Sequence, residues 1–125
     1  MFAPLNTHSI YSKMRGTIPL MKLITRTKEL HISHIALTEV NGLWGFIRFV
    51  QHCNNSEIRP IAGVNLMTDT QEVVMLVENQ YGYENLCRII SEVHDDQTKL
   101  ISDILKNYSS GLFVLSHDVS TLSLI

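Results

Sequence analysis

The sequence predicts a single α/β domain with a mostly parallel sheet and one β-hairpin. Short apolar, β-branched segments alternate with longer segments of helical periodicity, as in strands joined by crossover helices. Only the four residues 68–71 separate two expected strands, so this connection must be an antiparallel hairpin. A length of 125 residues fits one domain, which we expect to span residues 1–125.

The first half of the chain contains three expected strands and two expected helices. Residues 2–5 form a short apolar strand, and a polar loop follows over 6–16. A helix is expected over 18–30, with Thr17 as its N-cap and Pro19 in its first turn. The next elements are a strand over 34–38, a helix over 43–52 and a strand over 60–67. The expected inner face of the second helix consists of Leu43, Phe46, Ile47, Val50 and Cys53.

The second half begins with the hairpin and ends in a tail without an assignment. A strand over 72–77 follows the turn, and apolar periodicity predicts helices over 81–93 and 98–108. Gly111 ends the second of these helices. The last expected strand covers 112–116, and residues 118–125 have no clear pattern.

The composition is that of a packed, weakly charged domain. Its 45% hydrophobic and 18% charged content favours a globule over disorder. A net charge of -2 provides no global basic field, so we expect contact with DNA only indirectly. Cys53 and Cys87 lie in apolar helical patterns and are expected to be reduced thiols of a cytoplasmic protein. The chain has neither a run long enough to span a membrane nor a signal-peptide pattern.

Residues 35–45 are the most informative segment of the chain. They run from an apolar strand through a polar turn into an aromatic-rich helix. This order places Glu39 at the carboxyl end of a strand, where open α/β sheets and barrels have their ligand sites.

Five segments of the chain resemble the motifs of one protein family, in the same order. Residues 5–12, LNTHSIYS, are similar to L-H-x-H-S-x-Y-S, and residues 36–45, ALTEVNGLWG, to A-L-T-D-H-G-N-L-F-G. Residues 58–65, IRPIAGVN, are similar to I-K-P-I-I-G-C-E, and residues 81–91, YGYENLCRIIS, to E-G-Y-x-N-L-C-R-L-L-S. A weaker similarity joins residues 111–116 to G-L-I-V-L-S. The chain thus resembles the PHP (polymerase and histidinol phosphatase) domain of bacterial DNA polymerase III alpha subunits.

The resemblance implies a distorted β/α barrel with a metal centre at the carboxyl ends of its strands. Active members use this centre for phosphoester hydrolysis, including 3′–5′ exonuclease-type removal of nucleotides. A whole domain of this type is about twice as long, so we expect this chain to be the N-terminal half of a PHP-like domain. Its parent would be a DNA-directed DNA polymerase, a nucleotidyltransferase whose reaction belongs to other domains.

The chain departs from the family pattern at the implied metal ligands. Asn6 and Val40 stand where the family has His, and Asn65 stands where it has Glu. Glu39 replaces an Asp, and only His8 is unchanged. An amide is a weak neutral ligand and valine cannot bind metal, so we expect a degenerate site without a required cofactor. The alternatives are a weak residual Zn²⁺ or Mn²⁺ site at His8 and Glu39, or a His8 bonded within its own loop beside a solvated Glu39.

We therefore expect a degenerate domain with a structural or docking role in DNA replication or repair synthesis, without its own catalysis. The alternative is a weak metal-dependent phosphoesterase or 3′–5′ exonuclease-type hydrolase. A third hypothesis is a non-functional remnant that folds only by oligomerising. An incomplete barrel leaves an exposed sheet edge and an uncovered apolar face. We expect this surface to pack against the remainder of a polymerase or against another copy of the chain.

Several other residues favour structural roles. Ser9 and Ser12 lack a third group that would orient a nucleophile, so we expect them to form hydrogen bonds within their loop. Tyr11 and Trp44 are expected to pack in the core or at strand ends. The first loop and helix carry five cations, expected to form a solvated face because aromatic residues do not interleave with them. These cations are Lys13, Arg15, Lys22, Arg26 and Lys28.

Overall fold

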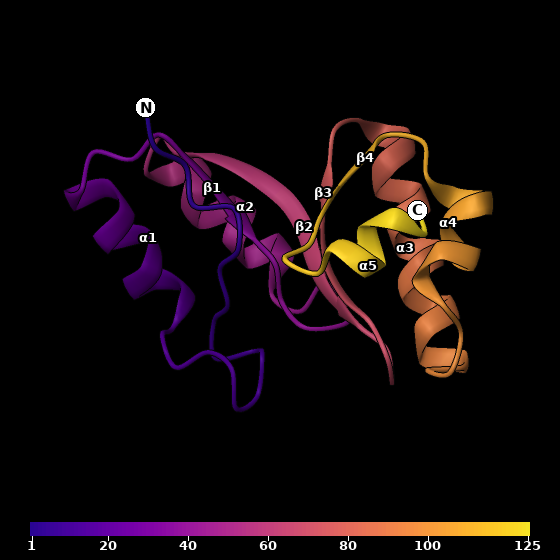
Figure 1. Ribbon diagram of the computed structural model, residues 1–125. Coiled ribbons are helices and arrows are strands. Elements are labelled where there is room, and N and C mark those ends of the chain that lie inside the picture. The colour runs from indigo at the N-terminus through magenta and orange to yellow at the C-terminus, as the bar shows by residue number, and fades with distance from the viewer.

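A four-stranded sheet in the order β1-β2-β3-β4 forms the centre of the molecule (Figure 1). The computed structural model describes residues 1–125. The strands are β1 (His34–Leu37), β2 (Arg59–Met67), β3 (Glu72–Val77) and β4 (Leu112–Leu115). The helices are α1 (Leu20–Glu29), α2 (Phe46–Asn55), α3 (Gln80–Asp95), α4 (Ile101–Tyr108) and α5 (Val119–Ser123). The α/β class and the hairpin are therefore confirmed.

The sheet is mixed, which corrects the prediction of a mostly parallel one. β1 and β2 pair in parallel, whereas β3 pairs antiparallel with both β2 and β4. Two helices, α3 and α4, connect β3 to β4, so the chain returns in the direction opposite to β3. β1, β2 and β4 consequently share one direction, and their carboxyl ends lie at the same edge of the sheet.

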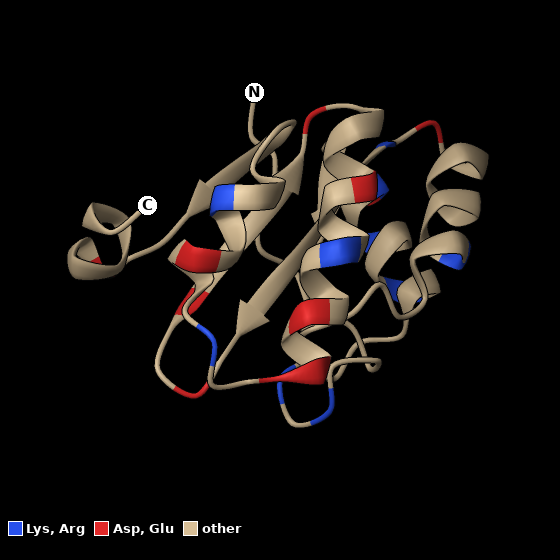
Figure 2. Ribbon diagram, turned by 90° about the vertical axis from the view of Figure 1, so that its right-hand side faces the viewer, with Lys and Arg blue, Asp and Glu red and all other residues tan.

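Two apolar clusters hold the helices to the sheet. In one, Ile35 and Leu37 of β1 pack with residues of α1 and α2. In the other, Val64 of β2 and Met75 of β3 pack with residues of α3 and α4. Figure 2 shows α3 and α4 in front of the strands from this side. Because strand side chains alternate between faces, the residues between these core positions point to the opposite face.

That opposite face carries exposed apolar side chains. Val74 lies opposite Asn65 in β2 and Leu115 in β4. Phe113 and Leu115 are 55% and 41% exposed, and β4 is the last strand of the sheet. We call Val74, Phe113 and Leu115 the open face. None of the helices combines the length and the apolar character that a membrane-spanning helix requires.

The N-terminal segment lies beside β1 without forming the strand expected over residues 2–5. The Ala36 N–H donates to Pro4 O at 2.9 Å, and the Thr38 N–H donates to Thr7 O at 2.9 Å. The two donors on the β1 side are two residues apart, whereas their acceptors, Pro4 and Thr7, are three residues apart. The pairing therefore does not keep the constant register of a strand ladder. Pro4 also has no N–H with which to extend a ladder.

The first helix starts later than the sequence predicts. α1 begins at Leu20, with Pro19 rather than Thr17 at its N-cap. Pro19 has ψ 146°, which is extended backbone, so it cannot belong to the first turn. The cap has no side-chain hydrogen bond.

The second helix also starts later, which changes its inner face. α2 begins after Gly45, whose φ of 69° is left-handed and interrupts the helical pattern. Phe49 and Cys53 are its buried residues, whereas Ile47, expected inside, is 66% exposed. In the second half, α4 begins at Ile101 rather than at residue 98, and the tail forms the short helix α5.

Candidate functional site

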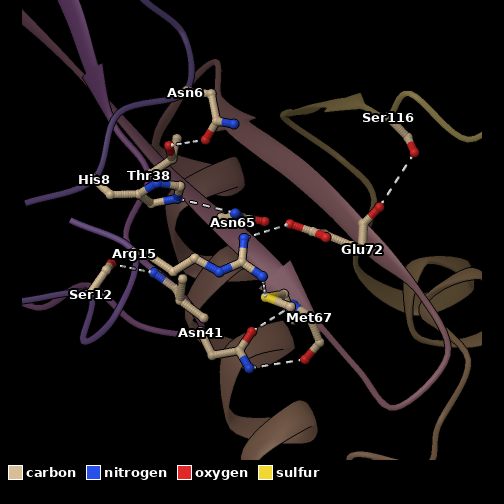
Figure 3. A network of polar contacts seen from close by, with 11 residues as sticks. Asn6, His8, Ser12, Arg15, Thr38, Asn41, Asn65, Met67, Glu72 and Ser116 are labelled. Atoms are coloured by element: carbon tan, nitrogen blue, oxygen red, sulfur yellow. Dashed lines mark hydrogen bonds and ion pairs between the residues drawn. The ribbon is translucent and has the colours of Figure 1, made fainter.

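The candidate site lies at the edge where the carboxyl ends of β1, β2 and β4 meet, beside the loop over residues 6–16 (Figure 3). Thr38, Glu39 and Val40 follow β1, and Val40 forms an isolated parallel bridge with Asn65 of β2. Asn6 reaches this edge by accepting a hydrogen bond from Thr38 Oγ1 at 2.8 Å. The structure therefore brings the sequence-predicted positions to one edge of the sheet.

Glu39 is buried among hydroxyl and amide donors. Only 1% of the residue is exposed, so the expectation of a solvated Glu39 is wrong. Its carboxylate accepts hydrogen bonds from Ser9 N at 2.7 Å, from Ser9 Oγ and from Ser12 Oγ at 2.8 Å. These donors take up three of its roughly four lone-pair positions. The prediction of hydrogen bonds within the loop holds for Ser9 Oγ, which accepts from the Tyr11 N–H at 3.2 Å, but both hydroxyls donate to Glu39 outside the loop.

Ser12 links the loop to the start of the next segment. Its hydroxyl donates to Glu39 and accepts from the Val40 N–H at 2.9 Å. Asn65 N–H in turn donates to Glu39 O at 3.0 Å. The loop, the end of β1 and β2 are therefore joined through these backbone and side-chain groups.

His8 contacts β2 rather than its own loop. His8 Nε2 lies 3.1 Å from Asn65 Nδ2, so the amide donates and the neutral imidazole accepts. Burial lowers the pKa of His8, the nearby charge of Glu39 raises it, and that of Arg15 lowers it further. The net direction is downward, which favours the neutral imidazole that this hydrogen bond requires.

Asn65 leaves one polar atom without a partner. The residue is 2% exposed, and its Oδ1 is buried without a hydrogen bond. Asn65 also borders a cavity of about 290 Å³, which Asn6, Glu72, Ser116 and His117 line together with apolar residues of β3 and β4.

A guanidinium group lies over this part of the site, which sequence reasoning missed. Arg15 Nη1 is 3.6 Å from Glu72 Oε1, and Arg15 Nη2 is 3.4 Å from Met67 Sδ. Figure 3 shows Arg15 between His8 and Glu72. Arg15 belongs to the group of cations expected to be solvated, but no spacing in the sequence indicates its partner in β3.

The side chains present do not fit the multinuclear metal centre that the family implies. No group of three or more His, Cys, Asp or Glu residues lies close enough to hold an ion. Three donors occupy the Glu39 carboxylate, and Val40 provides no ligand atom. The positive charge of Arg15 also opposes a second cation beside His8 and Asn65. These side chains can form hydrogen bonds with a ligand, but they do not provide the ligand set that holds a pair of ions for phosphoester activation.

A second cleft borders the same loop. Tyr11, Ser12, Lys13, Val40 and Trp44 line this space of about 510 Å³. Tyr11 and Trp44 are 39% and 47% exposed, so neither lies in the core, although Trp44 Nε1 donates to Val40 O just beyond the end of β1. We call this space the Tyr11–Trp44 cleft.

Charges of both signs are distributed over the surface. Arg26 pairs with Glu29 at 3.2 Å, in addition to the pair between Arg15 and Glu72. Figure 2 shows basic and acidic positions interspersed along the elements, including α3. Two of the five cations predicted to be solvated are therefore paired with carboxylates.

Alpha subunits of bacterial DNA polymerase III are among the relatives of this chain. It is 29% identical over 134 residues to the DNA polymerase III subunit alpha of Borreliella burgdorferi, and the match covers 92% of the chain and 12% of that protein. For the same subunit of Chlamydia muridarum, the identity is 28% over 132 residues, covering 90% and 11%. For that of Staphylococcus aureus, it is 26% over 125 residues, covering 96% and 12%. The chain thus spans about an eighth of the length of these relatives.

Solved structures and a family model identify the fold. An amidohydrolase from Chromobacterium violaceum aligns with a TM-score of 0.60 at 17% identity, over 74% of this chain and 33% of that one. A protein assigned as a metal-dependent phosphoesterase from Bifidobacterium adolescentis aligns with a TM-score of 0.57 at 12% identity, over 86% and 38%. At these identities the likeness concerns the fold alone. Since the model of the PHP domain matches residues 4–122, this chain belongs to the PHP domain family.

Proposed function

We propose that this chain is a degenerate PHP domain with a structural or docking role in a DNA polymerase III alpha subunit-like protein, without its own catalysis. One observation carries the proposal: Ser9 and Ser12 occupy the carboxylate of Glu39, and Val40 follows it where the family has a ligand. Metal-dependent hydrolysis requires open ligand positions, and these positions are filled or absent.

The proposal extends to the parent protein. We propose that the chain corresponds to the N-terminal half of a PHP-type domain. It aligns with only part, 33% and 38%, of two solved chains, so it is shorter than they are. Nucleotidyl transfer, in replication or repair synthesis, belongs to other domains of the parent. The open face and the free edge of β4 pack against the remainder of that polymerase or against a second copy of the chain.

Metal binding and hydrolysis test this proposal directly. We expect calorimetric titration with Zn²⁺ and with Mn²⁺ to show no stoichiometric binding, and bis(p-nitrophenyl) phosphate to remain uncleaved. The matched positive control restores the family ligands through Asn6→His, Val40→His and Asn65→Glu together, and should gain affinity for metal. Binding of one ion by the unaltered chain that is lost in His8→Ala would contradict the proposal.

The second candidate is a weak metal-dependent phosphoesterase or 3′–5′ exonuclease-type hydrolase. It is favoured by the proximity of the His8 imidazole to Asn65, whose Oδ1 has no partner. Under this alternative, hydrolysis of a 3′-terminal nucleotide from an oligodeoxynucleotide would depend on Mn²⁺ and stop with a chelator. The same loss in His8→Ala would assign the activity to this chain rather than to a contaminating nuclease.

A further inference from the structure

Two aromatic rings in the Tyr11–Trp44 cleft are held in fixed positions although both are exposed. Trp44 Nε1 donates to Val40 O at 3.0 Å, and the indole meets the His94 ring edge-on at 6.1 Å. The Tyr11 ring lies so close to Gly45 that a Cβ there would come within 2.7 Å of it. Rings that are already ordered lose little conformational entropy when a ligand binds.

The cleft has one free positive charge at its rim. Lys13 is exposed and belongs to none of the four ion pairs of the chain. The next cation, Arg15, is already paired with Glu72. Val40 adds an aliphatic wall. The lining thus combines aromatic and aliphatic surface with a single ammonium group, like the centre and rim of a protein interface.

We propose that the Tyr11–Trp44 cleft binds a short peptide segment of a partner protein, with an aromatic side chain next to a carboxylate. The aromatic side chain lies between Tyr11 and Trp44, and the carboxylate pairs with Lys13. Single-stranded nucleic acid is the other class with planar groups and negative charge. It needs a basic groove along its backbone, whereas Lys13 is the only charged residue of this lining. This inference rests on the proposed docking role and names a surface for it.

The single tryptophan of the chain allows a direct test. The probe is the peptide acetyl-Gly-Phe-Glu-Gly-amide, titrated into the 125-residue chain while Trp44 fluorescence and the indole N–H signal in NMR spectra are followed. We expect saturable changes, with a dissociation constant of about 1 mM for so small a ligand. The matched peptides with Gln in place of Glu, or Ala in place of Phe, should bind more weakly.

Variants of the chain separate the aromatic from the ionic contribution. Tyr11→Ala should weaken binding about tenfold or more, as for a central aromatic contact. Lys13→Gln should weaken it by about two- to fivefold and abolish the preference for Glu over Gln. The controls, Tyr81→Ala and Lys22→Gln, remove an exposed aromatic ring and an exposed cation outside the cleft. Both should leave binding unchanged, and thermal unfolding verifies that each variant is folded.

Three results would overturn the inference. The first is a Trp44 signal that none of the peptides changes. The second is equal weakening by the cleft variants and their controls. The third is tighter, salt-sensitive binding of octathymidylate at the same residues, which would assign the cleft to nucleic acid. The metal titration is independent of these outcomes, so failure of the peptide test alone would leave the degenerate-domain proposal standing.

Discussion

At the scale of single residues, the buried carboxylate of Glu39 joins the N-terminal loop to the end of β1. It accepts hydrogen bonds from the backbone and hydroxyl of Ser9 and from the hydroxyl of Ser12. A buried charge without such partners is costly, whereas a fully bonded one orders the groups around it. At a position where the resemblance to the family implies a metal ligand, the Glu39 carboxylate is thus bonded to the N-terminal loop.

Glu39→Gln should destabilise the fold by about 1–3 kcal/mol, because an amide cannot accept all three hydrogen bonds. The free energy of unfolding in urea measures this effect. The control is Glu29→Gln, which removes an exposed carboxylate paired with Arg26. That change should cost less than about 1 kcal/mol. If both substitutions lowered the free energy of unfolding equally, the buried hydrogen bonds of Glu39 would not stabilise the fold more than an exposed ion pair does.

His8 should make stability depend on pH below neutrality. Its pKa is lowered in the folded chain from an ordinary 6.5, chiefly by burial. Between the folded and the unfolded pKa of His8, the unfolded chain binds more protons than the folded chain. The contribution of neutral His8 to the free energy of unfolding is therefore fully present above about pH 6.5 and is lost as the pH decreases. Protonation would also place an N–H of His8 against the Asn65 amide, which itself donates.

Urea unfolding between about pH 7.5 and about pH 5.5 tests this dependence. His8→Asn should make the free energy of unfolding depend less steeply on pH. His31→Asn is the control, because His31 is exposed and its φ of 56° suits asparagine. The assignment of a neutral imidazole would be contradicted if the free energy of unfolding of His8→Asn depended more steeply on pH than that of the unaltered chain. A titration of His8 above its ordinary pKa in NMR spectra would contradict it as well.

At the scale of elements, the first turn of α3 lies against the backbone just before β4. A Cβ at Gly82 would lie 1.9 Å from Gly111 O. Asn79 caps α3 by accepting from Gly82 N at 3.0 Å, and Gly111 itself has a left-handed φ of 77°. Glycine at position 82, within the motif YGYEN, therefore allows α3 to pack closely against the backbone of Gly111.

Gly82→Ala should destabilise the fold by about 1–3 kcal/mol or more, since a backbone carbonyl cannot move aside as a side chain can. Thermal and urea unfolding measure the change. Tyr81→Ala alters the adjacent residue, which is 72% exposed, and should have little effect. If Gly82→Ala were neutral, this contact between α3 and the segment before β4 would not constrain the fold.

At the scale of the whole molecule, the helices α1 to α4 leave the open face of the sheet without a helical cover. Phe113 and Leu115 project from β4, whose outer edge has no neighbouring strand. Edges and apolar faces of this kind pair with other chains. The mixed sheet thus has one face held by the chain's own helices and another suited to a partner.

The isolated chain should self-associate through this surface. Sedimentation velocity over a range of concentrations is expected to show dimers or larger species. Replacing Phe113 and Leu115 together by serine should shift the population to monomer, because the apolar area is removed. Met21→Ser, at an exposed position of α1, is the matched control and should not. A monomer at all concentrations would contradict this view of the open face.

Local signals account for the parts of the fold that were predicted correctly. The bounds of β3 match, because the continuous apolar run over residues 73–77 follows a four-residue turn and has no other place than the second strand of a hairpin. The start of α2 was missed because helical periodicity continues through residues 43–45, whereas Gly45 takes a left-handed φ. The strand over residues 112–116 was predicted, but its antiparallel pairing with β3 was not, since that pairing depends on how α3 and α4 pack.

The same distinction holds for the site. The sequence by itself determined that Asn6, Val40 and Asn65 cannot supply the family's imidazole and carboxylate ligands, because residue chemistry does not depend on the fold. Only the tertiary structure decided that Glu39 faces two serine hydroxyls, and that Arg15 pairs with Glu72. These partners lie far apart along the chain, and they meet because sheet pairing and core packing bring the loop against the carboxyl ends of the strands.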